Sequence, residues 1–323
     1  GKGNGTKRIG LRADMDALPM EEKTNLSWRS TIPGRFHGCG HDGHTTILLG
    51  TARYLAQTRN FDGTVAFIFQ PAEEGLGGAP AMIKDGLFER FPFDVIYGLH
   101  NHPGAAEGTW LLRSGPLMAA ADTVEITITG KGGHASRPHL TIDPVVVACN
   151  LVVSLQTIVA RSIDPTQTAV VTVGAIHAGE ASNVIPESAK MLLTVRSFDP
   201  KVRELLEARI RKLTESIADG YGASVDIDYT YGHPVVVNSE KETEFARMVA
   251  EELVGADKVT TCGLIPGSED FSHYLEHKPG SFLRLGNGVN SAILHSAKYD
   301  FADESLTTGA AMWARLTERY LDA

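Results

Sequence analysis

The chain has 323 residues, of which 42% are hydrophobic and 21% charged, a balance typical of a soluble globular protein and too apolar for a disordered one. Its net charge of -9 argues against nucleic acid and anionic membranes as partners, because both require a basic surface. The three cysteines, Cys39, Cys149 and Cys262, form no CxxC pair, so we expect no disulfide framework and a reducing cytoplasm.

The first third of the chain alternates strand and helix patterns. Short apolar runs typical of buried strands are "RIGLRAD" (8–14), "TVAFIF" (64–69) and "DVIYGLH" (94–100). Helical spacing of apolar residues covers 45–58, with Thr45 or Thr46 near the expected N-cap, and a shorter helical signal ends at Gly86. Strands and helices in alternation predict a mostly parallel α/β sheet.

A second pattern runs from residue 117 to 230. It predicts four strands, at 122–130, 167–176, 189–198 and 224–231, and two helices, at 143–160 and 200–220. The order β-α-β-β-α-β is that of a ferredoxin-like α+β unit. The helix at 143–160 contains the longest apolar run, "VVVACNLVVSL" (145–155), which is too short to span a bilayer and indicates a buried helix.

The α/β pattern resumes after residue 230. A helix is expected at 239–254, a strand at 281–286 and a last helix at 304–320. The sequence therefore predicts one α/β domain made of residues 1–116 and 231–323, into which a ferredoxin-like domain of residues 117–230 is inserted.

Ligand-type side chains follow the predicted strands of the first domain. They are Asp14, Asp16, Glu73, Glu74 and His100, and the segments "HGCGHDGH" (37–44) and "ILHSAKYDF" (293–301) add Cys39, His41 and His295. Because the site of an open α/β sheet lies beyond the carboxyl ends of its strands, we expect these side chains to meet. Cysteine, histidine and glutamate are ligands of zinc and its first-row neighbours, so the pattern predicts a metal site.

Some side chains near this pattern have other interpretations. Of the adjacent glutamates, one can bind metal while the other holds a water. His44 is interpreted as a brace or cap of the following helix, His102 as structural or cleft-lining, and Asp42 as a group that orients a ligand.

Seven motifs, in order, resemble the M20 metallopeptidases: "LRADMDALPM", "HGCGHDGHTT", "FQPAEEGLGGA", "GLHNHPG", "GGHASRPH", "GSEDFS" and "LHSAKYDF". Within that family the chain is similar to the amidohydrolase branch that contains hippurate hydrolase, N-acyl-L-amino-acid aminoacylases and auxin-conjugate hydrolases. The resemblance implies a metal-dependent amidohydrolase that cleaves N-acyl amino acids, either hippurate-like or N-acetylated. Members of the family usually carry a further stretch before the segment that matches Lys7, so we expect the natural sequence to begin earlier.

The resemblance also implies a site for two divalent metal ions per subunit, which can be Zn, Mn, Co or Ni. The matching ligand positions are Cys39, His41, Glu74, His100 and His295. Glu73 matches the general base that takes a proton from a water activated by the two metals. Asp16 matches the acid that orients a ligand.

For the inserted domain, the resemblance implies a lid or dimerisation role. His134 in "GGHASRPH" matches a residue that helps to bind the scissile carbonyl, typically in the cleft of the partner subunit. Asn183 and Arg196 match substrate-contacting positions. A homodimer or homotetramer formed through this domain is expected, with a small N-acyl amino acid as substrate and no nucleic-acid or membrane partner.

Two alternatives remain at this point. A dipeptidase or carboxypeptidase of the same superfamily would share the chemistry and differ in the leaving group. A non-enzymatic homologue that binds amino-acid conjugates would be expected to lack Glu73 or several ligands, and this chain has all of them.

Overall fold

The computed structural model describes residues 1–75 and 77–322, which form two compact units. The first unit comprises residues 1–117, 236–264 and 269–323, and the second comprises 118–235 and 265–268. The second unit thus reaches beyond the expected range of 117–230. It includes 265–268 because the main-chain N–H of Ala119 donates to the carbonyl oxygens of Ile265 (3.1 Å) and Gly267 (3.0 Å).

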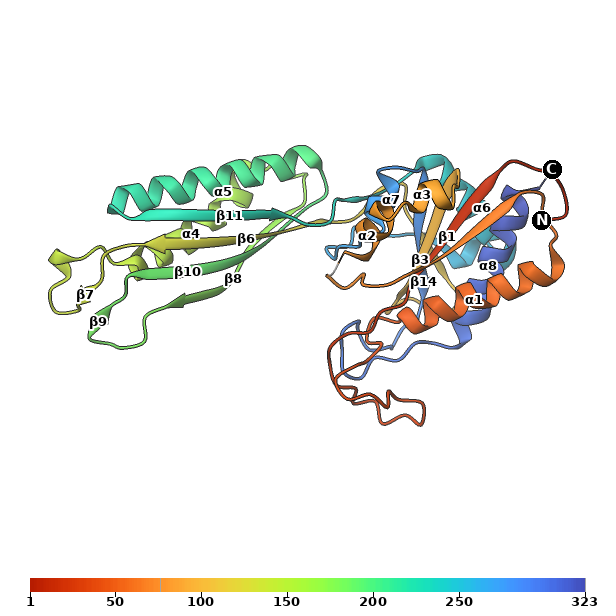
Figure 1. The fold of residues 1–323 in the computed structure, drawn as a ribbon, viewed down its shortest axis with the longest axis horizontal. Helices are drawn as coiled ribbons and strands as arrows, with labels where there is room; N and C mark the ends of the chain where they lie inside the picture. The colour runs from red at the N-terminus through yellow and green to blue at the C-terminus, as the bar shows by residue number, and fades with distance from the viewer. Residues whose placement is uncertain (76, 323) are drawn as a thin grey trace. The chain divides into compact units, whose positions relative to one another are not determined.

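The first unit is built on a six-stranded sheet, which confirms the predicted α/β class (Figure 1). The strand order is β13 (Val259–Thr261), β4 (Trp110–Leu112), β14 (Gly280–Gly286), β3 (Val95–His102), β1 (Arg8–Asp14) and β2 (Thr64–Gln70). β1 pairs in parallel with both β2 and β3, and β14 pairs in parallel with β3, whereas β4 runs antiparallel to β14. The carboxyl ends of β1, β2 and β3 therefore share one edge of the sheet.

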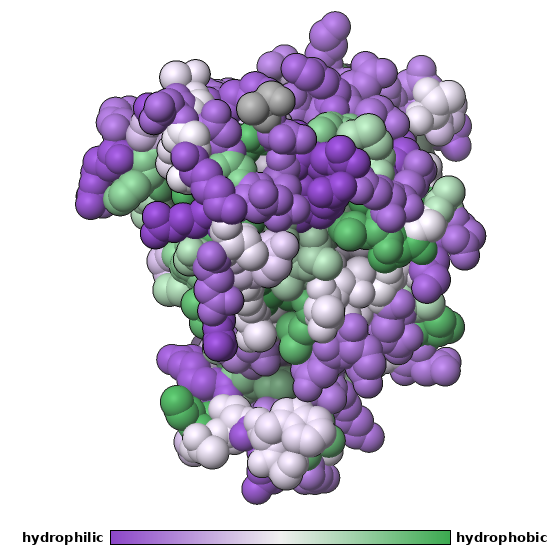
Figure 2. Space-filling model, turned by 90° about the vertical axis from the view of Figure 1, so that its right-hand side faces the viewer, coloured by the Kyte–Doolittle hydropathy of each residue, from purple (hydrophilic) through white to green (hydrophobic). Residues whose placement is uncertain are grey.

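Helices lie on both sides of this sheet. On one side are α1 (His41–Thr58), α6 (Glu240–Val254) and α8 (Glu304–Tyr320), and on the other are α2 (Gly78–Lys84), α3 (Leu87–Arg90) and α7 (Ser272–Leu275) (Figure 1). Ile47 of α1 and Trp313 of α8 pack in one core with Leu11 and Leu283 of the strands. Seen from the right-hand side of Figure 1, hydrophilic residues cover much of the surface, with hydrophobic patches across its middle (Figure 2).

Helix α1 begins four residues earlier than the sequence predicted. Its N-cap is Gly40, so the expectation of a threonine cap at 45 or 46 is wrong. Both hydroxyls instead donate to main-chain carbonyls, that of Thr45 to Asp14 at 3.0 Å and that of Thr46 to Asp42 at 2.7 Å. The early start brings His41 into the first helical turn, which faces the end of β1.

The second unit has the predicted ferredoxin-like order. It contains β6 (Ala120–Thr129), α4 (Pro144–Ser162), β8 (Ala169–Ala178), β10 (Ser188–Ser197), α5 (Pro200–Tyr221) and β11 (Ser224–Tyr231), and its sheet order is β11-β6-β10-β8 with antiparallel neighbours. Asp143 and Asp199 cap α4 and α5 through hydrogen bonds from Val145 N and Lys201 N, and each is followed by proline, the favoured residue of a first helical turn.

Smaller elements connect these parts. In the second unit they are β7 (Gly133–His134), β9 (Val184–Ile185) and a 3₁₀ turn at Pro138–Leu140. β5 (Gly115–Met118) pairs with β12 (Val236–Asn238), and a second 3₁₀ turn, Ala256–Lys258, precedes β13.

Helix α4 extends well past the apolar run that looked too short for a bilayer. By length and composition alone it could cross a membrane, a test that core helices of soluble proteins also pass. Here Leu151 and Leu155 are buried in the core against the sheet. The opposite face is uncharged and open to solvent, with Val153 71% exposed, and no charged residue occurs from Pro144 to Ala160.

Candidate metal centre

The shared edge of β1, β2 and β3 collects all five predicted metal ligands. In four groups of three residues the ligand atoms lie within 4.8 Å of one another: Cys39, His41 and His100; Cys39, Glu74 and His295; His41, Glu73 and Glu74; and Asp14, His41 and His44. Cys39 and His41 each occur in more than one group. The groups therefore form one continuous cluster, which also includes the predicted base Glu73.

A glycine places the cysteine ligand beside β3. Gly40, between Cys39 and His41, has a φ of +87°, a value that side chains other than glycine rarely allow. A Cβ atom there would lie 2.2 Å from Nδ2 of Asn101, so only glycine lets the loop approach the strand this closely. As a result, the Cys39 Sγ lies 3.3 Å from Nε2 of His100.

The second pair of ligands is joined by a direct contact. Nε2 of His295 lies 3.1 Å from Oε1 of Glu74. His295 has a φ of +63°, uncommon for a residue with a side chain, and its main-chain N–H donates to the carbonyl of Gly38 at 2.8 Å. Two segments far apart in sequence are thereby held together next to Cys39.

His41 tests whether these residues fit a metal ion. Its side chain is 1% exposed, and neither ring nitrogen has a hydrogen-bond partner. Nδ1 lies 3.3 Å from an oxygen of Asp16, which is placed to orient the ring. Nε2 lies 3.7 Å from Asp14, too far for a hydrogen bond. Since buried polar atoms are normally hydrogen-bonded, an imidazole nitrogen without such a bond, next to thiol and carboxylate groups, fits a divalent cation.

Burial and the charges of neighbouring carboxylates shift the pKa values of several side chains in the cluster. Burial raises the pKa of Glu73 well above its usual range, and the charges of Glu269 and Asp14 add to the effect. Burial also raises the pKa of the Cys39 thiol. Burial by itself would lower the pKa of His41, but Asp14 and Asp16 raise it to about 9.

A buried arginine that the sequence pattern did not indicate lies beneath this cluster. The Arg12 guanidinium donates to Asp14 (2.7 Å), Glu269 (2.9 Å) and Asp270 (2.9 Å), and all four side chains are buried. Burial raises the pKa of Glu269 to about 8, although Arg12 opposes the shift. The motif "GSEDFS" contained the two acids, but nothing in the strand "RIGLRAD" indicated that Arg12 would pair with them.

His44 has a different place from the one expected. It does not cap the helix; its Nδ1 lies 2.6 Å from Asp14, and its Nε2 accepts the main-chain N–H of Asn101 at 3.0 Å. The ring therefore links β1 to β3. Asp42, expected to orient a ligand, is exposed and accepts a hydrogen bond from Gly43 N. His102 is half-buried, and burial together with the charge of Arg284 lowers its pKa to about 4.

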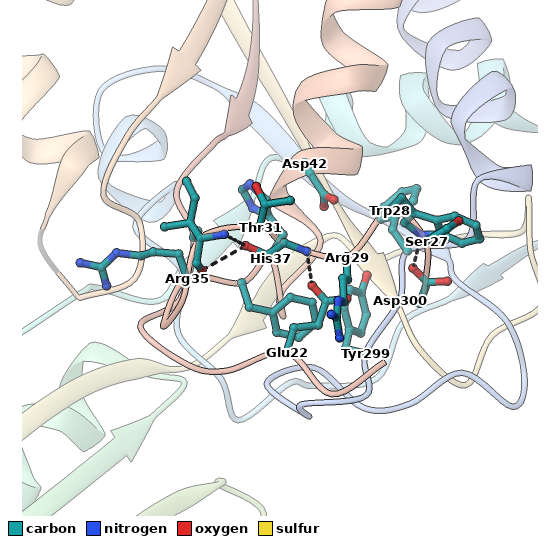
Figure 3. A pocket seen from close by; sticks show the side chains of 15 residues that line it. Glu22, Ser27, Trp28, Arg29, Thr31, Arg35, His37, Asp42, Tyr299 and Asp300 are labelled. Carbon is teal, nitrogen blue, oxygen red and sulfur yellow. Dashed lines mark hydrogen bonds between the residues drawn. The ribbon is translucent and has the colours of Figure 1, made fainter. Parts of the chain in front are cut away.

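The segment that precedes Cys39 also lines a cavity of about 560 Å³ (Figure 3). His37, Trp28 and Tyr299 are among the side chains around it, and Trp28 donates to Asp300 at 3.4 Å. None of the five predicted metal ligands lines this cavity.

In the second unit, two of the three predicted substrate residues lie together. β7 and β9 pair His134 with Val184, and the main-chain N–H of Ala135 donates to the carbonyl of Asn183 at 3.1 Å. Arg196 lies far from them, near the other end of β10, where it is paired with Ala121. At about 3.3 Å per residue, the stretch of β10 from Ser188 to Arg196 spans about 26 Å.

The ring of His134 has a defined tautomer. Its Nδ1 lies 3.1 Å from the main-chain nitrogen and 2.9 Å from the hydroxyl of Ser136. A main-chain N–H can only donate, so Nδ1 is an acceptor and the neutral ring carries its proton on Nε2. His134 thus presents a donor on its exposed side.

Comparisons with known proteins agree with this picture. The sequence pattern of peptidase family M20/M25/M40 matches residues 10–319. The chain is 44% identical over 322 residues to hippurate hydrolase from Campylobacter jejuni, covering 99% of this chain and 83% of that enzyme. It is 43% identical over 292 residues to N-acetyl-L-cysteine deacetylase from Bacillus subtilis, covering 90% of this chain and 69% of that enzyme.

A solved structure gives the same result at the level of the fold. The YXEP protein of Bacillus subtilis, described as a dinuclear metal binding peptidase from the M20 family, matches with a TM-score of 0.86 and 36% identity, over 100% of this chain and 83% of that one. These matches confirm the family that the seven motifs resemble. The chain therefore belongs to peptidase family M20/M25/M40 and is a metal-dependent amidohydrolase.

Proposed function

We propose that this protein hydrolyses the amide bond of N-acyl amino acids. The observation that carries the proposal is the cluster at the ends of β1, β2 and β3, in which Glu73 accompanies five metal-ligand side chains. The similarity to hippurate hydrolase and N-acetyl-L-cysteine deacetylase supports an acyl group on one side of the amide and an amino acid on the other.

The ligand set would hold two divalent ions through Cys39, His41, Glu74, His100 and His295. Such ions, when bound, lower the pKa of a water towards neutrality and polarise a carbonyl. Glu73 has its own task in this scheme. Its carboxylate takes a proton from the attacking water and then delivers it to the nitrogen of the leaving amino acid, as a general base followed by a general acid.

The second unit supplies the groups that would bind the rest of the substrate. The Nε2–H of His134 would donate to the carbonyl oxygen as negative charge develops on it. The Arg196 guanidinium would pair with the free α-carboxylate, a charge-assisted contact, and Asn183, beside His134, would contact the same molecule.

Two of these contacts would require a second subunit. Within one subunit, Arg196 lies near one end of β10, whereas His134 pairs with Val184, just before the other end at Ser188. The stretch from Ser188 to Arg196 spans about 26 Å, farther than a small N-acyl amino acid extends. We therefore propose a homodimer in which each substrate meets Arg196 of one subunit and His134 of the other. The uncharged outer face of α4, with Val146 and Val153 exposed, is the surface that the second copy would cover.

A substrate screen tests the proposal. Metal-stripped protein is supplied separately with Zn²⁺, Mn²⁺, Co²⁺ and Ni²⁺ and given benzoylglycine, N-acetylcysteine or an unblocked dipeptide, and release of the free amino acid is measured. Metal-dependent turnover of the N-acyl compounds above that of the dipeptide is expected. Preference for the dipeptide would identify a dipeptidase, and no turnover with any metal would contradict the proposal.

A further inference from the structure

We propose that Asn101 is a positioning residue that holds the Cys39 segment and the His100 ring together as a preassembled half of the metal centre. The inference rests on the proposed metal ligands. Asn101 is not among the residues predicted from the sequence to have a role, yet it is fully buried at the end of β3, between two of these ligands.

Asn101 contacts the residues around it through three separate groups. Its side-chain Nδ2 donates to the main-chain carbonyl of Cys39 at 2.6 Å. Its own carbonyl oxygen lies 2.9 Å from Nδ1 of His100. Its main-chain N–H donates to Nε2 of His44 at 3.0 Å, and Nδ2 lies 3.1 Å from the same nitrogen.

These contacts define the state of both imidazoles. A carbonyl oxygen can only accept, so His100 carries its proton on Nδ1, and its free lone pair on Nε2 faces the Cys39 thiol at 3.3 Å. His44 accepts at Nε2 and therefore donates from Nδ1 to Asp14 at 2.6 Å. The contact at Nδ1 thus aims the ligand nitrogen of His100 at the Cys39 side, as outer partners of metal ligands commonly do.

The amide side chain adds the link to the cysteine. It is packed against Gly40, where even one Cβ atom would come within 2.2 Å of Nδ2. Its Oδ1 has no hydrogen-bond partner, so the donor half of the amide makes the contact that matters. A substitution that removes this donor would release the Cys39 carbonyl while leaving the main-chain contacts to His100 and His44 in place.

The experiment uses Co²⁺ as the probe, because cobalt bound to a thiolate absorbs in the near ultraviolet. Metal-stripped wild type, Asn101→Ala and Asn101→Asp are titrated with Co²⁺ against a competing chelator. Asn101→Asp keeps the shape of the side chain and replaces its donor with an acceptor, so it decides the question if Asn101→Ala does not fold. We expect the affinity of the thiolate-containing site to fall about 10–100-fold in both variants, with a shifted cobalt–thiolate band.

The matched control is Asn238→Ala. Asn238 is also a buried asparagine of the first unit, 2% exposed, with Nδ2 donating to the carbonyls of Arg113 and Phe282, each at 3.0 Å. We expect Asn238→Ala to lower the melting temperature without changing cobalt affinity or the band. Unchanged affinity and band in a folded Asn101 variant would overturn the inference, and so would equal losses of affinity in the Asn238 control.

Wild type and Cys39→Ser separate this inference from the proposed ligand set. If wild type shows the band and Cys39→Ser loses it, Cys39 is a ligand and the Asn101 variants test the positioning role alone. If wild type binds Co²⁺ without the band, the ligand set itself is wrong, and the inference about Asn101 falls with it.

Discussion

At the scale of single residues, the decisive features are buried polar atoms and the partners that they have or lack. His41 is almost completely buried, and its ring nitrogens have carboxylates near them (Asp16 at 3.3 Å, Asp14 at 3.7 Å) without a well-formed hydrogen bond, whereas His44, three residues later, has a partner at both nitrogens. The same side chain in the same helix therefore has two different roles. His41 is left open to a cation, and His44 joins β1 to β3.

Glu73 gives the first test at this scale. Glu73→Gln removes the proton carrier but none of the five proposed ligands, so bound metal should stay near two ions per subunit while kcat falls about 10²–10⁴-fold. Metal analysis and turnover of benzoylglycine measure the two effects, with Glu89→Gln, an exposed change on α3, as the control. A near-normal rate for Glu73→Gln would show that another group moves the proton.

His134 gives the second test, because the tautomer predicts which nitrogen donates. The amide nitrogen of glutamine reaches the place of Nε2, whereas that of asparagine lies near Nδ1. We expect His134→Asn to lose about 10²–10³-fold in kcat, as for a lost oxyanion donor, and His134→Gln to retain more activity. Steady-state kinetics on one substrate compare them. Equal or greater activity of the asparagine variant would argue against Nε2 as the donor.

At the scale of elements, one buried acid ties three parts of the second unit together. Asp122 on β6, 2% exposed, forms an ion pair with Arg203 of α5 and accepts hydrogen bonds from the Tyr229 hydroxyl (3.0 Å) and Gly232 N (3.1 Å). The ferredoxin-like order could be predicted from periodicity, but this connection could not. Asp122 occupies an ordinary position in an alternating strand, and its partners are distant in sequence.

Asp122→Ala should therefore destabilise the second unit. Removing one partner leaves the Arg203 charge and several donors unpaired, which typically costs about 3–5 kcal/mol in the free energy of unfolding. Urea denaturation measures the loss, and Asp228→Ala, an exposed change on β11, should stay within about 0.5 kcal/mol of wild type. Similar stability of the two variants would mean that the buried pair contributes little.

At the scale of the whole molecule, the question is whether one chain suffices for activity. His134 lies near the start of β10 at Ser188, and the strand runs about 26 Å from Ser188 to Arg196. If His134 and Arg196 both touch one substrate, two chains must contribute. Oligomeric assembly is then part of the active site rather than an addition to it.

Mixing two inactive variants tests this directly. His134→Ala and Glu73→Gln are combined under conditions that exchange subunits, which makes about half of the dimers mixed. Each mixed dimer has one site with an intact Glu73 and an intact His134, so roughly a quarter of wild-type activity should return by this mass-action estimate. No recovery despite proven exchange would place His134 in its own subunit's site or in none.

The outer face of α4 gives an independent test of the same assembly. Val153→Asp places a charge on the proposed interface, so we expect monomers that bind metal but turn over little substrate. Sedimentation velocity measures the association state. Leu205→Asp, on α5 and 39% exposed, is the matched control and should remain a dimer. A dimeric Val153→Asp variant would show that the second copy docks elsewhere.

The sequence alone determined the class of this protein. Strand and helix periods depend on local spacing, so the α/β class and the ferredoxin-like unit could be predicted. The start of α1, the short strands β4 and β13 of the main sheet and the inclusion of 265–268 in the second unit could not. Ligand-type side chains indicated a metal site because they follow the predicted strands directly in the sequence. The motif order identified the family, which the comparisons confirm.

Only the tertiary structure decided which side chains meet. Arg12, Asn101 and Glu269 lie within the quoted motifs, but nothing in those motifs indicated the contacts of Arg12 with Glu269 or of Asn101 with Cys39 and His44, which join segments far apart in the sequence. The structure likewise turned His44 from a helix brace into a link between strands, and separated Arg196 from His134. Sequence spacing reports periodic burial along one segment, whereas a site depends on distances between segments, and those are determined by the packing of the chain.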